Sequence, residues 1–71
     1  MIHAEYHTEL NGGGMVVATT LVEAKTMDEA RDIAKRQIRS DGYRVRGFRT
    51  ARRDPRGRWV VVHGVRPEAE G

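Results

Sequence analysis

The sequence predicts an α+β fold in the order β-β-α-β-β, with one amphipathic helix packed on one face of a four-stranded, mainly antiparallel sheet. Only residues 26–42 show helical periodicity, and two strand-like stretches lie on each side of them. Gly-rich or Pro-Gly turns separate the strands of each pair. With 71 residues the chain is long enough for one small domain. We place this domain at residues 1–65 and expect a disordered tail at 66–71.

The first pair of strands is predicted at residues 1–10 and 15–25, joined by a turn at Asn11-Gly12-Gly13-Gly14. Residues 1–10 alternate between two faces, as in a strand with one buried side. In the second strand one face is our choice for the core: Val16, Ala18, Thr20, Val22 and Ala24. Val17 and Leu21 are apolar too but point the other way, so the second face is either covered or meets a partner.

The helix has marked ends. Thr26 and Glu29 form a capping-box pattern at its start, and Gly42 suits the left-handed conformation that ends many helices. We expect Tyr43 to pack against Ile38 after this turn. The buried stripe contains small residues, Ala30 and Ala34, which let the helix approach the sheet closely.

The second pair of strands is predicted at residues 43–52 and 58–65. Asp54-Pro55-Arg56-Gly57 between them is a strong turn sequence. Phe48 is out of phase with Tyr43 and Val45, and a β-bulge at Gly47 would bring it back inward. One helix covers only part of four strands, so some of the opposite sheet face should be open.

Composition excludes several classes of protein. The chain has no Cys, which rules out disulfides and thiolate metal sites, and no apolar run near membrane-spanning length. We therefore expect a cytoplasmic protein with no membrane partner. The net charge of +3 is uneven: residues 1–30 hold one cation and five acids, and residues 31–71 hold twelve cations and five acids. This asymmetry suits a polyanion, an acidic protein or head-to-tail self-association.

The strongest functional signal is the Arg-rich second hairpin, in which Tyr43, Phe48 and Trp59 are interleaved with the arginines. Cations can contact phosphates, and aromatic rings can stack on bases. The first hypothesis is thus a small nucleic-acid-binding or regulatory protein that contacts DNA or RNA. Its candidate residues are Arg44, Arg46, Arg49, Arg52, Arg53, Arg56 and Arg58. The plain alternative is that these arginines are a solvated surface and the aromatics belong to the core.

The second hypothesis is a protein-interaction module, such as an adaptor or a phage-encoded inhibitor. It would use Val17 and Leu21 on the open sheet face, or an edge strand, against an acidic partner. A third is a dimer that uses these faces on itself, and a small core with surplus apolar residues makes us expect a homodimer. His3 and His7 share a strand face but lie too far apart for one metal ion. We expect no cofactor and no enzymatic activity, because no nucleophile–base pair or carboxylate dyad is present.

Overall fold

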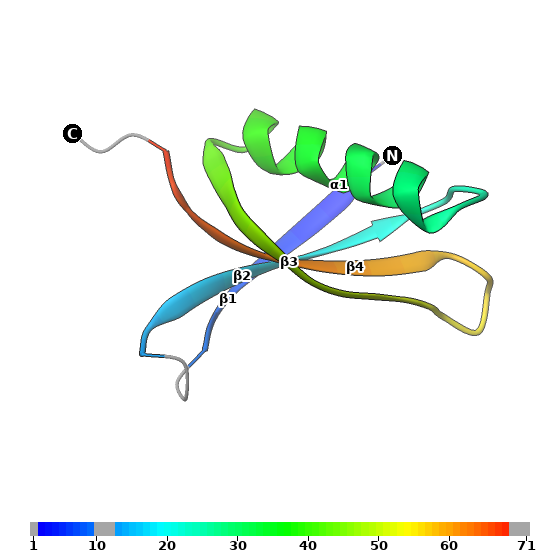
Figure 1. Ribbon diagram of the computed structural model, residues 1–71, viewed down its shortest axis with the longest axis horizontal. Helices are drawn as coiled ribbons and strands as arrows, with labels where there is room; N and C mark the ends of the chain where they lie inside the picture. The colour runs from blue at the N-terminus through cyan, green and yellow to red at the C-terminus, as the bar shows by residue number, and fades with distance from the viewer. Residues whose placement is uncertain (1, 10–12, 69–71) are drawn as a thin grey trace.

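The computed structural model describes residues 2–9 and 13–68, and it confirms the predicted fold class. Helix α1 lies across one face of a four-stranded antiparallel sheet with strand order β1-β2-β4-β3 (Figure 1). The elements are β1 (His3–Glu9), β2 (Met15–Val22), α1 (Met27–Ser40), β3 (Tyr43–Arg53) and β4 (Trp59–Pro67). β1 and β3 are therefore the edge strands, and β2 and β4 form the centre.

The core lies between α1 and the sheet, on the predicted side. The helix buries Ala30, Ala34 and Ile38. Ala30 and Ala34 pack in one cluster with Val22 and Val61. Ile38 packs in a second cluster with Ala18 and Val65. The small side chains of the two alanines allow the close approach that the sequence indicated. Between Val61 and Val65 on the same face lies His63, which is fully buried.

Both helix ends follow the sequence signals. The Thr26 Oγ1 accepts the Glu29 backbone N–H at 3.1 Å. The Glu29 carboxylate accepts the N–H of Lys25 at 3.2 Å, one residue earlier than in a capping box. At the other end Gly42 has φ +90°, and Tyr43 packs against the cluster that contains Ile38, as expected.

Strand β3 contains two irregularities, of which the sequence predicted one. The pairing with β4 shifts between Val45 and Gly47 and again between Phe48 and Thr50, so β3 has one extra residue at each place, Arg46 and Arg49. The first shift brings Phe48 to the helix side, where its ring meets the His63 ring edge-on at 5.7 Å between centroids.

The β3–β4 turn forms at the predicted residues. The Asp54 carboxylate accepts the backbone N–H groups of Arg56 and Arg58, and Gly57 has φ +84°. Strand β4 continues beyond the expected domain boundary at Val65, because Arg66 and Pro67 still pair with Arg44 and Tyr43. Residues 69–71 of the expected tail lie outside the described residues.

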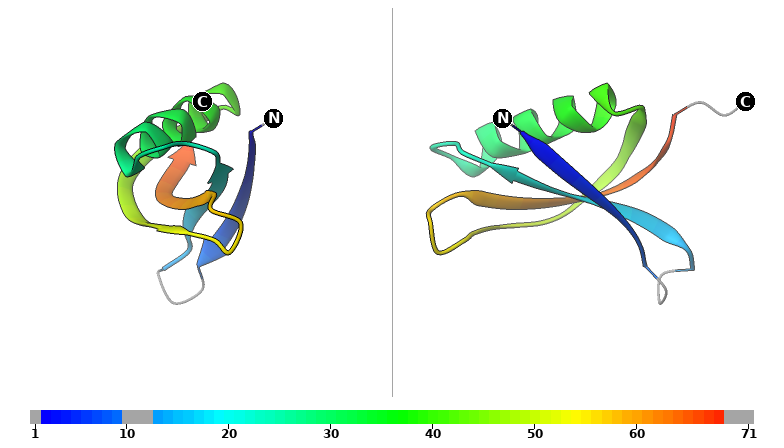
Figure 2. Two further views of the ribbon diagram at one scale, coloured as in Figure 1. Left: turned by 90° about the vertical axis from the view of Figure 1, so that its right-hand side faces the viewer. Right: turned by 180° about the vertical axis from the view of Figure 1, so that it is seen from behind.

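The sheet is strongly twisted. The β1–β2 hairpin crosses the β3–β4 hairpin in projection, and the same crossing is seen from behind (Figures 1 and 2). This twist brings the two edge strands close enough for one pair of side chains to bridge them. Arg49 in β3 donates two hydrogen bonds to the Glu9 carboxylate in β1, both 3.0 Å long.

Candidate nucleic-acid interface

At the turn end of the β3–β4 hairpin, two of the candidate arginines are bound by their own chain. The guanidinium of Arg53 donates to the carbonyls of Gly57 (3.0 Å) and Lys25 (3.2 Å) and lies over the Trp59 ring. The Trp59 indole N–H donates to the Ala24 carbonyl at 3.1 Å. These contacts tie the end of the β2–α1 connection to the hairpin, so Arg53 has a structural role.

Arg58 is held by Asp54. Its Nε and one terminal nitrogen lie 2.9 and 2.7 Å from the same carboxylate oxygen, and Asp54 is largely shielded from solvent whereas Arg58 is partly exposed. Burial alone would raise the pKa of Asp54, but the hydrogen bonds from Arg58 and Arg56 outweigh it and hold the pKa below its usual range. Through these contacts Arg58 stabilises the turn.

Arg49 is also engaged. Its hydrogen bonds to Glu9 raise the pKa of the guanidinium, which is thus permanently charged and paired. The contact joins β3 to β1 on the sheet face that the helix does not cover.

The three aromatic residues of the hairpin belong mainly to the core side. Tyr43 stacks on Tyr6 at 4.2 Å between ring centroids. Phe48 is 37% exposed, but the Arg31 guanidinium lies 3.9 Å from its ring centroid. Stacking of a nucleobase on these rings is therefore restricted, and the arginines and lysines are the main candidates for contacts.

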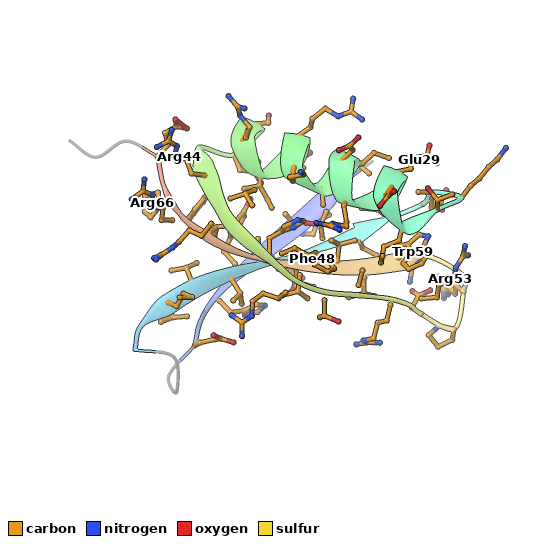
Figure 3. All side chains as sticks on the ribbon, in the orientation of Figure 1. Glu29, Arg44, Phe48, Arg53, Trp59 and Arg66 are labelled. Atoms are coloured by element: carbon orange, nitrogen blue, oxygen red, sulfur yellow. The ribbon has the colours of Figure 1, made fainter. Side chains whose placement is uncertain are left out.

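A different set of cations gathers at the open end of the hairpin, where β3 begins and β4 ends. Five side chains from α1, β3 and β4 line two adjoining hollows there, and we call them the basic cluster: Lys35, Arg39, Arg44, Arg46 and Arg66. In Figure 3, Arg44 and Arg66 lie at one end of the molecule, and Arg53 and Trp59 lie at the other.

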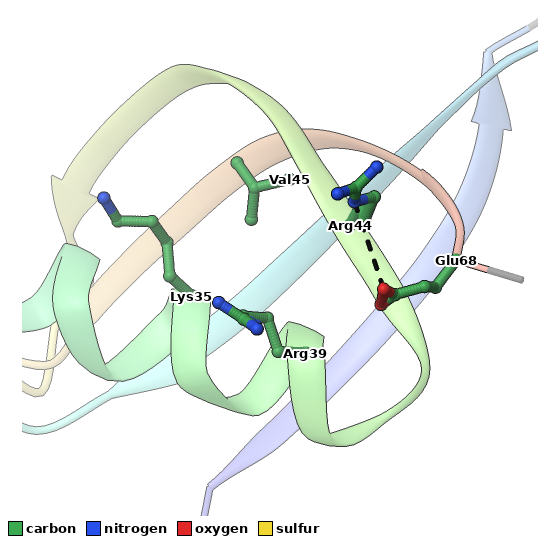
Figure 4. Close-up of a pocket in the computed structure, with 5 residues that line it drawn as sticks. All are labelled: Lys35, Arg39, Arg44, Val45 and Glu68. Atoms are coloured by element: carbon green, nitrogen blue, oxygen red, sulfur yellow. Dashed lines mark ion pairs between the residues drawn. The ribbon is translucent and has the colours of Figure 1, made fainter.

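The more enclosed of the two hollows has a volume of about 250 Å³ and lies between α1 and the β3 edge. Lys35, Arg39 and Arg44 surround it, and Figure 4 shows Val45 between Lys35 and Arg44. Glu68 is the one acid among its lining residues, and its carboxylate lies 4.0 Å from Arg44 Nε. Both side chains of this pair are about half exposed, so it contributes little to stability.

The arrangement of the basic cluster is electrostatically unfavourable. Arg44 and Arg66 are direct partners across β3 and β4, and like charges in that position destabilise a sheet. Lys35 and Arg39 are one helical turn apart, which is also unfavourable for like charges. Within the described residues, Glu68 is the only ion-pair partner of this cluster. A bound anion would remove the repulsion.

The structure thus separates the candidates that the sequence grouped together. It brings Arg44 and Arg46 into the basic cluster and places Arg49, Arg53 and Arg58 in intramolecular contacts. Arg52 and Arg56 are exposed near the turn, away from the cluster. Lys35 and Arg39 are not among the candidates predicted from the sequence, although their spacing of four residues places them on one helix flank.

The two candidate partner-binding residues, Val17 and Leu21, differ in their exposure to solvent. Both lie on the sheet face opposite α1, paired with His7 and His3 of β1. Val17 is only 8% exposed, whereas Leu21 is half-buried. Leu21 alone therefore offers appreciable surface to a partner.

Two further properties concern residues 2–9 and 13–68. Their one helix lacks the length and apolar character needed to cross a membrane. They contain no group of three or more His, Asp or Glu residues placed to hold a metal ion. No protein-family model, curated protein or solved structure matches this chain.

Proposed function

We propose that this protein binds nucleic acid in a non-catalytic role, with the basic cluster contacting backbone phosphates. The observation that carries the proposal is the cross-strand pair Arg44–Arg66, two like charges kept side by side at an exposed sheet end. The fold gains nothing from this pair, whereas a phosphate between or beside the two guanidinium groups would be bound by charge-assisted hydrogen bonds.

A chain of phosphates fits the cluster better than a single small anion. Its five cations come from α1, β3 and β4 and extend over two adjoining hollows around the β3 edge. Four of the five are arginines, whose planar guanidinium can bind two phosphate oxygens at once. Because these are backbone contacts, we expect binding to depend strongly on salt and weakly on base sequence.

The test is fluorescence anisotropy with a labelled DNA duplex and a labelled single-stranded RNA at about 50 mM salt. The double variant Arg44→Gln, Arg66→Gln should bind on the order of 100-fold more weakly, since each lost phosphate contact costs roughly tenfold at this salt. The two probes tell which nucleic acid is preferred.

The matched control is Arg36→Gln with Arg56→Gln, which removes the same charge from exposed positions outside the cluster. It should keep most of the wild-type affinity. Equal losses in the two double variants would show that only net charge matters, and no binding by the wild-type protein to either probe would overturn the proposal.

A protein-interaction role is the second candidate. It is favoured by the half-buried apolar side chains on the sheet face away from α1, Leu21, Val60 and Val62.

A further inference from the structure

The sheet face opposite α1 has an ordered pattern of side chains across its four strands. One row runs His3, Leu21, Val60 and Arg52 from β1 to β3, and the next runs Glu5, Thr19, Val62 and Thr50. The two central strands thus give a half-buried apolar stripe, and the two edge strands give polar and charged margins. A hollow of about 180 Å³ lies between β1 and β2, lined by His3, Glu5, Thr19 and Leu21.

The two margins carry opposite charge. Glu5 stands on the β1 margin, and its ion-pair neighbour within the described residues is His7 at 3.8 Å, which is charged only when protonated. Arg52 stands on the β3 margin, exposed, with no ion pair to another described residue. Farther along the face Glu9 and Arg49 already neutralise each other. Beside the apolar stripe, Glu5 and Arg52 therefore form an acid and a base on opposite margins, whereas Arg44 and Arg66 lie farther along the same face, beyond Gly47 and Gly64.

We propose that this face binds a second copy of the chain, with a two-fold axis that runs along the strands. Such an axis sets β1 of one copy against β3 of the other, whereas an axis across the strands would set each margin against itself. It places Glu5 one row, about 7 Å along the strand, from Arg52 of the partner subunit, which an arginine side chain can span. The contact forms twice because the interface is two-fold symmetric.

The area of this sheet face determines how strong the self-association should be. Four strands at about 4.8 Å spacing and two to three rows along them cover a few hundred Å². This is less than the roughly 800 Å² per partner of a standard interface, so the dimer should be weak and concentration-dependent. Since the axis runs along the strands, both basic clusters lie at the same end of the dimer.

The test is sedimentation equilibrium without nucleic acid, which keeps it separate from the binding proposal above. The wild-type mass should rise from 8.0 kDa towards twice that value with increasing concentration. Glu5→Arg and Arg52→Glu should each weaken self-association at least tenfold, because each places like charges opposite one another twice. Both positions are exposed, so circular dichroism should show folded protein in both cases.

Mixing the two variants gives the decisive result. A heterodimer of Glu5→Arg with Arg52→Glu has complementary charges at both contacts, so the mixture should associate at least as well as the wild-type protein. A mixture that stays as weak as its components would overturn the two-fold arrangement, and a wild-type protein that is monomeric at all concentrations would overturn the dimer.

The control pair is Asp32→Arg and Arg36→Glu, on the exposed side of α1 away from the sheet. Each changes the net charge by the same amount as its counterpart on the sheet face. Self-association should be unaltered in both. An equal loss in the controls would assign the effect to net charge and contradict the proposed contact.

Discussion

The two ends of the β3–β4 hairpin differ in how their arginines are bound. At the turn end, carbonyls and a carboxylate of the same chain bind Arg53 and Arg58. At the open end, Arg44 and Arg66 face each other as like charges. The residue type and the hairpin are the same at both ends. The difference lies in the acceptors nearby. Asp54 and two backbone carbonyls accept hydrogen bonds at the turn end, whereas at the open end the only ion-pair partner among the described residues is Glu68, 4.0 Å from Arg44.

A count of arginines therefore does not identify a binding surface. An arginine with intramolecular acceptors has already exchanged water for protein contacts, and a ligand must displace them. An arginine beside another cation gains from an anion that relieves the repulsion. Charge at the turn end should therefore maintain the fold, and charge at the open end should be free for a ligand.

The largest expected effect comes from His63, which lies in β4 between the two ends. Burial and the nearby Arg31 and Lys35 lower its pKa to about 4 from an ordinary value near 6.5. Below about pH 6.5 His63 binds a proton in the unfolded chain but not in the folded protein. The free energy of unfolding should therefore decrease, by up to about 3 kcal/mol, as the pH falls to about 4. Urea unfolding at several pH values in this range measures the loss of stability.

His63→Leu provides the control for this prediction. Neither ring nitrogen of His63 has a hydrogen-bond partner among the described residues, so an apolar side chain of similar size should be tolerated. The variant should lose most of the pH dependence in this range. A wild-type stability that stays flat from pH 6.5 to pH 4.5 would contradict the low pKa.

At the turn end, Asp54→Ala should be the most damaging substitution. It removes the acceptor of two backbone N–H groups and of the Arg58 guanidinium. We expect the Tm to fall by roughly 10 °C. A thermal melt followed by circular dichroism checks this, and an unchanged Tm would show that the turn does not depend on its carboxylate.

A smaller loss is expected for Arg53→Gln, which breaks two hydrogen bonds and the contact with Trp59. The Tm should fall by roughly 5 °C. Arg52→Gln is the matched control, since this neighbouring arginine points to the other sheet face and its side chain makes no hydrogen bond to another described residue. Equal effects of the two substitutions would remove the distinction between structural and available arginines.

The smallest expected effect is an increase in Tm. Arg44→Gln removes the repulsion with Arg66, and the lost contact with Glu68 is long and exposed. The Tm should rise by about 1–2 °C. A clear fall in Tm would show that Arg44 contributes to the fold, and the contrast between the two ends of the hairpin would then fail.

Local signals explain how far the sequence could predict this structure. The caps at Thr26 and Gly42 and the turn at Asp54 depend on residues close in sequence, and all three form, except that Glu29 accepts the N–H of Lys25 instead of that of Thr26. The bulge next to Gly47 was also predictable, from the phase of Phe48. The one at Arg49 was missed, although Phe48 and Ala51 both face the helix at a spacing of three residues.

The candidate site was less predictable because its geometry depends on distant pairings. Arg49 meets Glu9 forty residues away, and the sequence contains no sign of that contact. Arg58 with Asp54 is the exception, since an acid four residues before an arginine across a tight turn is a recognisable pair. Lys35 and Arg39 join the hairpin arginines only because α1 crosses the sheet beside the start of β3.

Whether the basic cluster binds phosphates is tested most directly by the salt dependence of duplex binding, measured for the wild-type protein and for Arg44→Gln, Arg66→Gln. If all five cations of the basic cluster contact phosphates, the slope of log K against log salt should be about −4.5, and about −2.7 in the variant. The same substitutions should leave the Tm unchanged or slightly higher. An identical slope for the two proteins would contradict phosphate binding by Arg44 and Arg66, because the phosphates would then be bound elsewhere.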